Sequence, residues 1–316
     1  MSRDAWLSVL MPLHEGERDL PATLASLARE DLSGVEIFAL DSSPTDRLRA
    51  LLEQHSPSLP FVYLHVPELR SWTAKTNLAA THASGKYLCM LHQDDLWLPG
   101  RIAALRRTIV EHPRAVLLLN PSTIVDRDGR DLGAWRCPLP AGREIEGSDM
   151  AGSLLIQNYV AIPAPVIRRD AWAAVGGLDE ALWYTADWDL YLKLAGFGSA
   201  VYQPRATTAF RIHGRSLTVT GSADLADFAD QMSRVIERHL DLAPLGQRDT
   251  IARCALASSA INCALAQALI GNMRPMPSAI VSLVRLGPRQ VVRYVHCSRI
   301  VERVVPRLRA RLAGAL

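Results

Sequence analysis

Two periodicities alternate through the first 120 residues. Short apolar runs, each long enough for one buried strand, are separated by stretches in which leucine or isoleucine recurs at helical spacing. The apolar runs cover residues 6–13, 35–40, 61–66, 87–91 and 115–119. Strands that alternate with helices build βαβ units. We therefore predict an α/β fold: a doubly wound, mostly parallel sheet with helices on both faces.

Turn-forming residues interrupt this pattern after residue 120. Residues 120–146 are rich in Asp, Gly and Pro, which predicts a hairpin and an irregular loop. Residues 161–167 contain two prolines and are typical of an edge strand. Short helices are expected at 171–175 and 188–195, because each stretch is followed by glycine.

The last third of the chain carries few strand signals. Four large apolar residues share one helical face, and residues 251–270 form an alanine-rich helix candidate; the four are Phe228, Met232, Val235 and Ile236. We therefore divide the chain into an α/β domain, residues 1–220, and a helical C-terminal region, residues 221–316.

Composition excludes several classes of protein. A hydrophobic fraction of 49% supports a large core, and a net charge of +3 is too small to indicate nucleic-acid binding. The five cysteines are odd in number and include no CxxC pair, which favours reduced thiols. The N-terminus does not resemble a signal peptide, and no run approaches the roughly 18 apolar residues of a spanning helix. We expect a cytoplasmic protein.

Polar residues follow three of the predicted strands. His14 and Glu15 follow the first run, Asp41 follows the second, and an Asp94-Asp95 pair follows the fourth. Ligands of open α/β sheets bind at the carboxyl ends of the strands, so these side chains should meet at one rim. No GxGxxG or GxxxxGK[ST] motif is present. A divalent cation is the remaining device for holding phosphates, because hard cations favour oxygen ligands.

Six sequence blocks, in the same order, resemble those of family 2 glycosyltransferases with the GT-A fold. They lie at residues 7–15, 39–46, 74–79, 85–99, 176–190 and 210–216. The resemblance covers roughly residues 5–220. It implies an inverting glycosyltransferase that moves a sugar from a nucleoside diphosphate sugar to a hydroxyl group of a glycan or glycoconjugate, as in the assembly of cell-surface polysaccharide.

The block at 176–190 matches the acceptor side of the family. The resemblance implies that Asp187 is the general base that removes the acceptor proton. Asp187 also suits the N-terminus of the helix at 188–195, and the two roles are compatible. An aromatic group close by either forms an acceptor platform or packs in the core: Trp183, Tyr184 and Trp188.

The resemblance also implies a donor site. Asp41 should contact the base or ribose of the nucleotide, although it could instead cap a helix near Thr45. Arg211 is the first candidate for a phosphate contact, with Lys75 and Arg215 as weaker ones. The complete set of donor-site candidates is Pro12, His14, Glu15, Asp41, Lys75, Asn77, Gln93, Asp94 and Arg211.

The metal-binding block contains Asp94 and Asp95, which we assign to a divalent cation, Mg²⁺ or Mn²⁺. A simple turn before the helix that follows Pro99 is the alternative. The resemblance adds His213 as a further metal ligand, although a lone histidine is more often an ordinary surface or core residue.

Three positions depart from the family pattern. His92-Gln93 replaces the first carboxylate of the metal motif, Ser42 stands where a second aspartate is common, and Ala186 stands where an acid is frequent. The changes at His92-Gln93 and at Ala186 motivate an alternative function: a catalytically inactive, nucleotide-sugar-binding subunit of a glycan assembly complex. A nucleotidyltransferase is disfavoured, since no glycine-rich basic loop follows the first strand.

The C-terminal tail is basic. Eight arginines and one acid, Glu302, lie between Arg285 and Arg311, interleaved with valines. A basic amphipathic helix of this kind binds anionic membranes, here the inner face of the membrane. The alternative is a helix packed on the catalytic domain or on a second copy of the chain, so a homo-oligomer stays open.

Overall fold

The structure is a computed structural model that describes residues 5–55, 59–214, 224–312 and 314. Strands and helices alternate up to residue 119: β1 (Leu7–Leu13), α1 (Leu20–Leu27), β2 (Val35–Asp41), α2 (Arg47–His55), β3 (Phe61–His65), α3 (Trp72–His82), β4 (Tyr87–Met90), β5 (Leu96–Trp97), α4 (Arg101–Glu111) and β6 (Leu117–Leu119). The middle of the chain contains β7 (Ser122–Val125), β8 (Asp131–Trp135), β9 (Glu144–Ile145), α5 (Gly147–Leu154), β10 (Val166–Arg168), α6 (Arg169–Ala174), α7 (Ala186–Phe197), β11 (Ala200–Tyr202) and β12 (Thr208–Arg211). The remainder is helical: α9 (Leu225–His239), the 3₁₀ turn η1 (Leu240–Leu242), α10 (Arg248–Leu269), α11 (Met276–Val284), α12 (Pro288–Ser298) and α13 (Ile300–Leu312).

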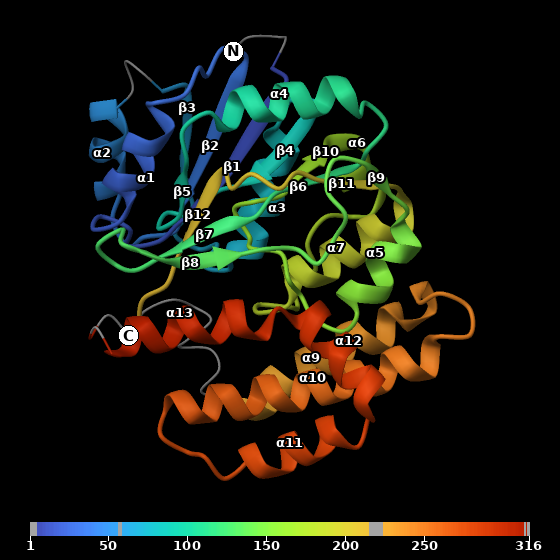
Figure 1. Cartoon of the computed structure of the whole chain (residues 1–316). Helices are drawn as coiled ribbons and strands as arrows, with labels where there is room; N and C mark the ends of the chain where they lie inside the picture. Colours follow the sequence, from blue (N-terminus) through green and yellow to red (C-terminus); the bar gives the residue numbers. More distant parts are fainter. Residues whose placement is uncertain (1–4, 56–58, 215–223, 313, 315–316) are drawn as a thin grey trace.

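The main sheet has the strand order β3-β2-β1-β4-β10-β6-β11-β9 (Figure 1). The first four of these strands are parallel, while β10 runs antiparallel to both of its neighbours. The mostly parallel α/β sheet expected from the sequence is therefore confirmed, with its antiparallel pairs in the second half.

Helices cover both faces of this sheet, and β1 illustrates why. Val9 and Met11 point into a core with α1, α2 and α4, whereas Leu10 points into a second core with α3, α5 and α7. A strand buried on both faces needs apolar residues throughout, which accounts for the uninterrupted apolar runs of the sequence.

The segment at 161–167 was expected at an edge, and this prediction was wrong. Its strand, β10, lies between β4 and β6 in the interior of the sheet. Pro163 and Pro165 precede the first paired residue, Val166, so neither proline removes a hydrogen bond from the ladder.

A second, four-stranded sheet has the order β5-β12-β7-β8. Its β7 and β8 form an antiparallel pair, which confirms the hairpin expected between residues 120 and 146. The sheet joins the segment after β4 to the end of β12, two places where site residues were predicted.

Helix α3 is not evident from hydrophobic periodicity, because small and polar residues occupy most of its length. Ser71 caps it by accepting a hydrogen bond from the Ala74 amide at 3.4 Å. The two short helices expected at 171–175 and 188–195 are present as α6 and α7, and α7 begins two residues earlier than expected.

The C-terminal helices share the core of the sheet. Phe228, Met232 and Val235 of α9 belong to the same apolar cluster as Leu190 and Leu194 of α7. The helical character of this region is confirmed (Figure 1). The proposed division at residue 220 lies outside the described residues, and an independent C-terminal domain stays a prediction.

A buried ionic cluster joins α7 to α9. The Asp189 carboxylate is fully buried and lies 2.7 Å from Lys193 Nζ and 2.8 Å from both Arg238 Nη1 and His239 Nε2. Burial alone would raise the pKa of Asp189, but the hydrogen bonds from His239 and Lys193 outweigh burial and lower the pKa to about 2. Asp189 therefore fixes α9 on the α/β domain.

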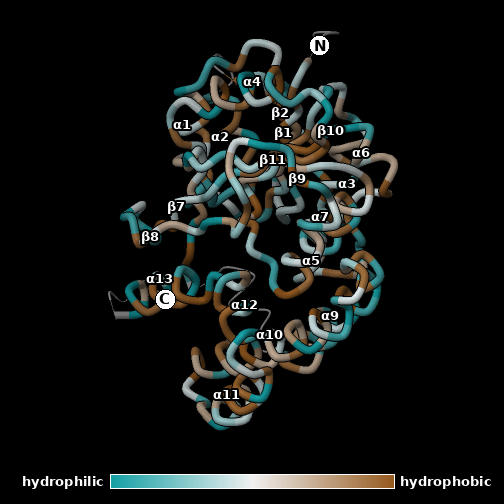
Figure 2. Tube along the Cα trace, turned by 45° about the vertical axis from the view of Figure 1, so that its right-hand side comes forward, coloured by the Kyte–Doolittle hydropathy of each residue, from teal (hydrophilic) through white to brown (hydrophobic). Residues whose placement is uncertain are grey.

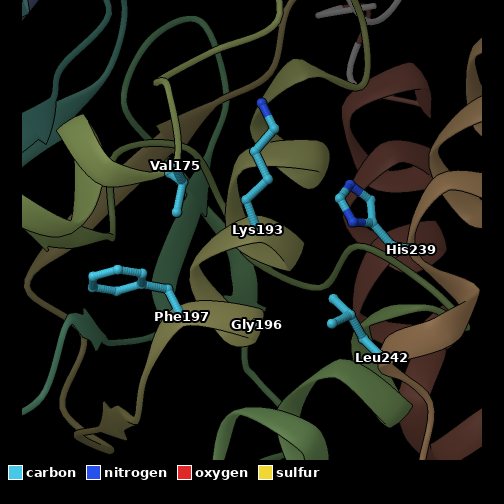
Figure 3. A pocket seen from close by; sticks show the side chains of 6 residues that line it. All are labelled: Val175, Lys193, Gly196, Phe197, His239 and Leu242. Carbon is cyan, nitrogen blue, oxygen red and sulfur yellow. The ribbon is translucent and has the colours of Figure 1, made fainter.

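A shallow pocket of about 380 Å³ adjoins this cluster and contains none of the predicted site residues; its lining is Val175, Lys193, Gly196, Phe197, His239 and Leu242 (Figure 3). In Figure 3 the Lys193 side chain extends away from Gly196 and Phe197. Its ammonium group already binds Asp189 and the carbonyl of Gly177. We therefore do not place the functional site here.

Asp189→Asn should lower the free energy of unfolding by about 3 kcal/mol, because it leaves buried cationic partners uncompensated. Urea denaturation at pH 7 measures this change. Asp230→Asn is the matched control, since Asp230 forms an exposed ion pair with Arg234 on α9; its expected effect is below about 0.5 kcal/mol.

The difference between wild type and Asp189→Asn should also depend on pH. The folded pKa of about 2 lies below the ordinary value of 3.8, so this stabilisation is complete above pH 4. It is lost as the pH falls towards 2. Equal decreases in the free energy of unfolding for Asp189→Asn and Asp230→Asn at pH 7 would contradict the role of Asp189 in holding α9.

Candidate active site

The turn after β4 carries the carboxylate pair. Asp94 Oδ2 lies 3.0 Å from Nε2 of His213, which follows the end of β12 by two residues. Burial alone would raise the pKa of Asp94, but the hydrogen bond and the charge of His213 lower it below its usual value. The structure thus brings together two of the three predicted metal ligands from distant parts of the sequence.

Asp95, the third predicted ligand, is almost fully buried. Its Oδ1 accepts a hydrogen bond from the Arg211 amide at 3.0 Å. Burial and the neighbouring charge of Asp94 raise the pKa of Asp95 well above its usual value. Two adjacent carboxylates with opposed pKa shifts repel each other, and a divalent cation would relieve this repulsion.

His92 belongs to the same cluster, although the sequence showed it only as a departure from the family pattern. Ligand atoms of His92, Asp94 and Asp95 all lie within 4.8 Å of one another. The Nε2 atom of His92 is buried and has no hydrogen-bond partner within the part of the chain that is described. Burial lowers the pKa of His92, which favours the neutral imidazole that binds metals. One imidazole and two carboxylates fit a divalent cation. His92 could have been predicted as a ligand from the sequence, because an imidazole can replace a carboxylate in a metal site.

Arg211 was predicted to contact phosphate. In the structure the residue is 4% exposed, and its guanidinium binds backbone carbonyls. Nε donates to the carbonyl of Asp94 at 2.8 Å. Nη1 donates to the carbonyls of Asp126 and Arg127 at 3.0 and 2.7 Å. Arg211 therefore holds the turn after β4 against the β7–β8 hairpin. The weaker candidate, Arg215, lies outside the described residues.

Asp41, at the end of β2, is fully buried. Its Oδ1 accepts hydrogen bonds from the amide and hydroxyl of Ser43 at 2.8 and 2.5 Å, and its Oδ2 accepts one from the Tyr63 hydroxyl at 2.8 Å. None of these donors belongs to α2, so these bonds give no support to the alternative role as a helix cap. A contact between Asp41 and a nucleotide stays a prediction.

Lys75 of α3 extends to the ends of β1 and β2. Its ammonium group is buried and donates to the carbonyl of Leu13 at 2.6 Å and to Ser42 Oγ at 2.7 Å. Burial lowers the pKa of Lys75 to about 8. Ser42, one of the three departures, thus serves as the acceptor of this lysine. A contact of Lys75 with phosphate stays a prediction.

The loops after β1 and β4 are joined by one amide side chain. Gln93 accepts from the His14 amide and donates to the His14 carbonyl, both at 2.8 Å. The side chains of His14 and Glu15 are exposed at this rim, and Glu15 has a left-handed backbone with φ of 47°. A left-handed backbone such as that of Glu15 is uncommon in a residue other than glycine and is typical of functional loops. Pro12, the remaining candidate of this strand, is buried within β1.

Helix α3 also contacts the segment before α7, where the resemblance places the acceptor side. Asn77 donates to the carbonyl of Leu178 and to Glu180 Oε1, both at 2.9 Å, and accepts from the Leu178 amide. Trp72 donates to the carbonyl of Trp183 at 2.8 Å and packs edge-on against His92, with ring centres 5.3 Å apart. Trp72 therefore contacts both the carboxylate turn and the segment that leads to Asp187.

Asp187 lies in the first turn of α7. Its Oδ1 accepts a hydrogen bond from the Trp188 amide at 2.8 Å, as expected at a helix N-terminus. Its Oδ2 accepts from Asn158 Nδ2 at 3.1 Å. Burial raises the pKa of Asp187 to about 6, with these two hydrogen bonds opposing the shift. Asn158 was not found from the sequence, because its segment carries no recognisable motif.

The three aromatic residues of this region differ in their roles. Trp188 is 5% exposed and donates to the carbonyl of Leu154, so it belongs to the core. Trp183 and Tyr184 are half-buried and pack towards α9, where Tyr184 lies 4.5 Å from the Phe228 ring. Trp188 is therefore no part of an acceptor platform. A platform formed by Trp183 and Tyr184 stays a prediction.

The end of the basic tail packs on the α/β domain. Helix α13 lies against β8 (Figure 1), where Arg309 donates to the carbonyl of Leu132 at 2.9 Å. Glu302 pairs with Arg136 at 3.2 Å. Of the two alternatives for the tail, packing on the domain is thus confirmed for α13. Within the described residues, none of the helices has both the length and the apolarity needed to cross a bilayer.

Comparison with known proteins identifies the family of the first part of the α/β region. The model of glycosyl transferase family 2 matches residues 8–153, which span β1 to α5 and include the carboxylate turn. Residues 8–153 belong to glycosyl transferase family 2. An uncharacterized glycosyltransferase of Haemophilus influenzae is 24% identical over 190 residues. That alignment spans 60% of this chain and 61% of the Haemophilus protein.

Solved structures of glycosyltransferases share the fold of this chain. The Staphylococcus aureus TarS fragment 1–349 in complex with UDP-GlcNAc has a TM-score of 0.67 at 18% identity, covering 89% of this chain and 80% of that one. The mannosyltransferase PcManGT of Pyrobaculum calidifontis, in complex with GDP-Man and Mn²⁺, has a TM-score of 0.53 at 15% identity, covering 96% and 86%. At these identities the likeness is one of fold, and the fold is GT-A.

Proposed function

We propose that this chain transfers a sugar from a nucleoside diphosphate sugar to a hydroxyl group of a glycan or glycoconjugate, with inversion at the anomeric carbon. One observation carries the proposal: Trp72 contacts both His92 of the carboxylate cluster and the segment leading to Asp187. A metal-binding cluster beside a carboxylate of raised pKa is the arrangement that such a transfer needs.

The divalent cation, Mg²⁺ or Mn²⁺, would be held by His92, Asp94 and Asp95, with His213 beside Asp94. When bound, the cation stabilises the negative charge of the departing nucleoside diphosphate. The Mn²⁺ in the PcManGT complex supports this assignment. Arg211 and Gln93 keep the turn in place through backbone contacts, so we assign them a positioning role.

The nucleoside would bind over the ends of β1 and β2. His14 and Glu15 are exposed there, and Asp41 lies beneath them. Because Asp41 already accepts a hydrogen bond from Tyr63, a direct contact with base or ribose requires this phenol to move aside. The UDP-GlcNAc in the TarS complex supports a donor of the nucleoside diphosphate sugar class.

Asp187 would accept the proton of the attacking hydroxyl group. Asn158 and the Trp188 amide bind its two carboxylate oxygens and orient them. A pKa of about 6 leaves Asp187 mostly ionised at pH 7 and a stronger base than an exposed aspartate.

The alternative, an inactive binding subunit, rested on His92-Gln93 and Ala186. His92 supplies a metal-binding group in place of the carboxylate, and Gln93 joins two loops of the site. Ala186 is fully buried in the first turn of α7, where a carboxylate would lose its hydration. These observations favour the enzyme.

Asp187→Asn should reduce sugar transfer or donor hydrolysis by roughly 10²–10⁴-fold while nucleotide binding is retained, because only the proton acceptor is removed. The wild-type rate should fall tenfold per pH unit below about 6, as Asp187 takes up a proton. Release of nucleoside diphosphate measures both effects.

Asp170→Asn is the matched control, since Asp170 is an exposed aspartate in the first turn of α6. Its rate and pH profile should equal those of wild type. A fully active Asp187→Asn enzyme, or a rate that is flat down to pH 4, would contradict the role of Asp187.

The membrane surface expected from the tail fits α11 and α12 better than α13. Exposed apolar side chains line these helices: Ile280, Val281, Val284, Val292 and Val295. Figure 2 shows short hydrophobic segments, in brown, among paler ones along α10 and α11. Residues 250–301 contain six arginines and no acid. Charge complementarity therefore points to an anionic membrane, reached from the cytoplasmic side.

The wild-type chain should sediment with vesicles that contain anionic lipid, and Val284→Asp should reduce the bound fraction severalfold by adding charge to the apolar face. Val110→Asp, at an exposed valine of α4, is the control and should bind like wild type. No sedimentation of the wild type, or equal binding by both variants, would contradict this surface.

A further inference from the structure

Two arginines of α13 carry charge that the described structure does not neutralise. Arg303 and Arg307 lie one helical turn apart and are half-buried. Among the described residues, neither has a carboxylate within ion-pair distance, whereas Arg299 on the preceding turn lies 3.9 Å from Glu302. Two like charges in a partly desolvated place repel each other and are retained at a cost.

Their hydrogen bonds leave part of this charge available. Arg303 Nη2 donates to Asn262 Oδ1 at 2.9 Å, while its buried Nη1 has no partner in the described structure. Arg307 Nη1 donates to the Arg303 carbonyl at 2.7 Å, and its guanidinium lies 5.9 Å from the centre of the Trp135 ring. Burial lowers the pKa of both groups, and repulsion by Arg303 contributes to the pKa of about 10 at Arg307.

A chain of hydrogen bonds places this pair beside the acceptor side of the site. Asn262, which binds Arg303, also donates to Gln157 Oε1 at 2.8 Å. The next residue after Gln157 is Asn158, which binds Asp187 at 3.1 Å. Burial raises the pKa of the Tyr184 phenol, and the charges of Arg303, Arg307 and Asp187 also act on it, so all three lie in its neighbourhood.

The other flank of the pair meets the second sheet. Trp135, under Arg307, packs edge-on against Phe210 with ring centres 5.5 Å apart. Phe210 immediately precedes Arg211, which holds the carboxylate turn. The arginine pair thus lies between the side that carries Asp187 and the second sheet, whose strand β5 follows the carboxylate turn.

We propose that Arg303 and Arg307 form an anion subsite that binds a phosphate group of the acceptor. Guanidinium groups bind phosphate oxygens through paired hydrogen bonds, and an unpaired, half-buried arginine pair is suited to this task. The inference rests on the proposed function and names the class of acceptor: one that bears a phosphate near the attacked hydroxyl. The C-terminal helices would then contribute to substrate choice as well as to packing.

The experiment measures binding of phosphate probes by calorimetry, without divalent metal, to the full chain. Glucose 1-phosphate represents a sugar phosphate and farnesyl diphosphate represents a prenyl-linked one. Both should bind at least about tenfold more weakly to the Arg303→Gln/Arg307→Gln double variant, because charged hydrogen bonds are lost. Tighter binding of farnesyl diphosphate would support a lipid-linked acceptor, and tighter binding of glucose 1-phosphate would support a sugar phosphate.

Three comparisons keep the test specific. Arg289→Gln, at an exposed arginine of α12, should bind both probes like wild type. Arg307→Lys keeps the charge without the planar fork and should give an intermediate loss, which covers the case of a misfolded double variant. Binding of UDP with Mn²⁺ should be unchanged in the double variant.

Unchanged phosphate binding in the double variant would overturn the subsite. Loss of UDP–Mn²⁺ binding in the folded double variant would assign the pair to the donor diphosphate, which also overturns the proposal. Failure of the proposed transferase function is a separate result. It would appear as absent donor hydrolysis in the wild type, whereas the subsite is tested by the binding of the phosphate probes.

Discussion

The buried guanidinium of Arg211 is the contact on which the arrangement of the site depends. It binds the carbonyl of Asp94 on one side and those of Asp126 and Arg127 on the other, while its own amide binds Asp95. Two adjacent carboxylates would otherwise drive their turn apart. Because Arg211 fixes the turn by its backbone, the carboxylate oxygens and His92 stay close enough to share a cation.

The proposed acceptor side depends on a second set of contacts, which lies only partly within the residues matched by the family model. Asp189 ties α7 to α9, and Asn77 and Trp72 of α3 hold the segment before α7. Asp187 sits at the N-terminus of the helix fixed in this way, with Asn158 on its second oxygen. The C-terminal helices therefore stabilise the position of the proposed base, apart from the membrane and acceptor surfaces that we propose for them.

Apolar strands and the carboxylates that follow them could be predicted from the sequence, because both follow from local pattern and from the geometry of parallel sheets. The interior place of β10 could not, since strand order is set by long-range packing. Asn158 was missed for a related reason, because its role depends on Asp187, 29 residues further along the chain. His92 lies next to its partners in the sequence and was missed because it was interpreted only as the loss of a carboxylate. The tail was left with two interpretations, because an amphipathic arginine helix has the same sequence pattern on a membrane as against its own domain.

Calorimetric binding of UDP, GDP and dTDP, with and without Mn²⁺, tests the central claim most directly. The account predicts that one nucleotide binds in a metal-dependent way and that Asp94→Asn loses this binding. Asp128→Asn, at an exposed aspartate of the β7–β8 hairpin, should bind like wild type. Absence of nucleotide binding under every condition, or metal-dependent binding that survives in Asp94→Asn, would contradict the account.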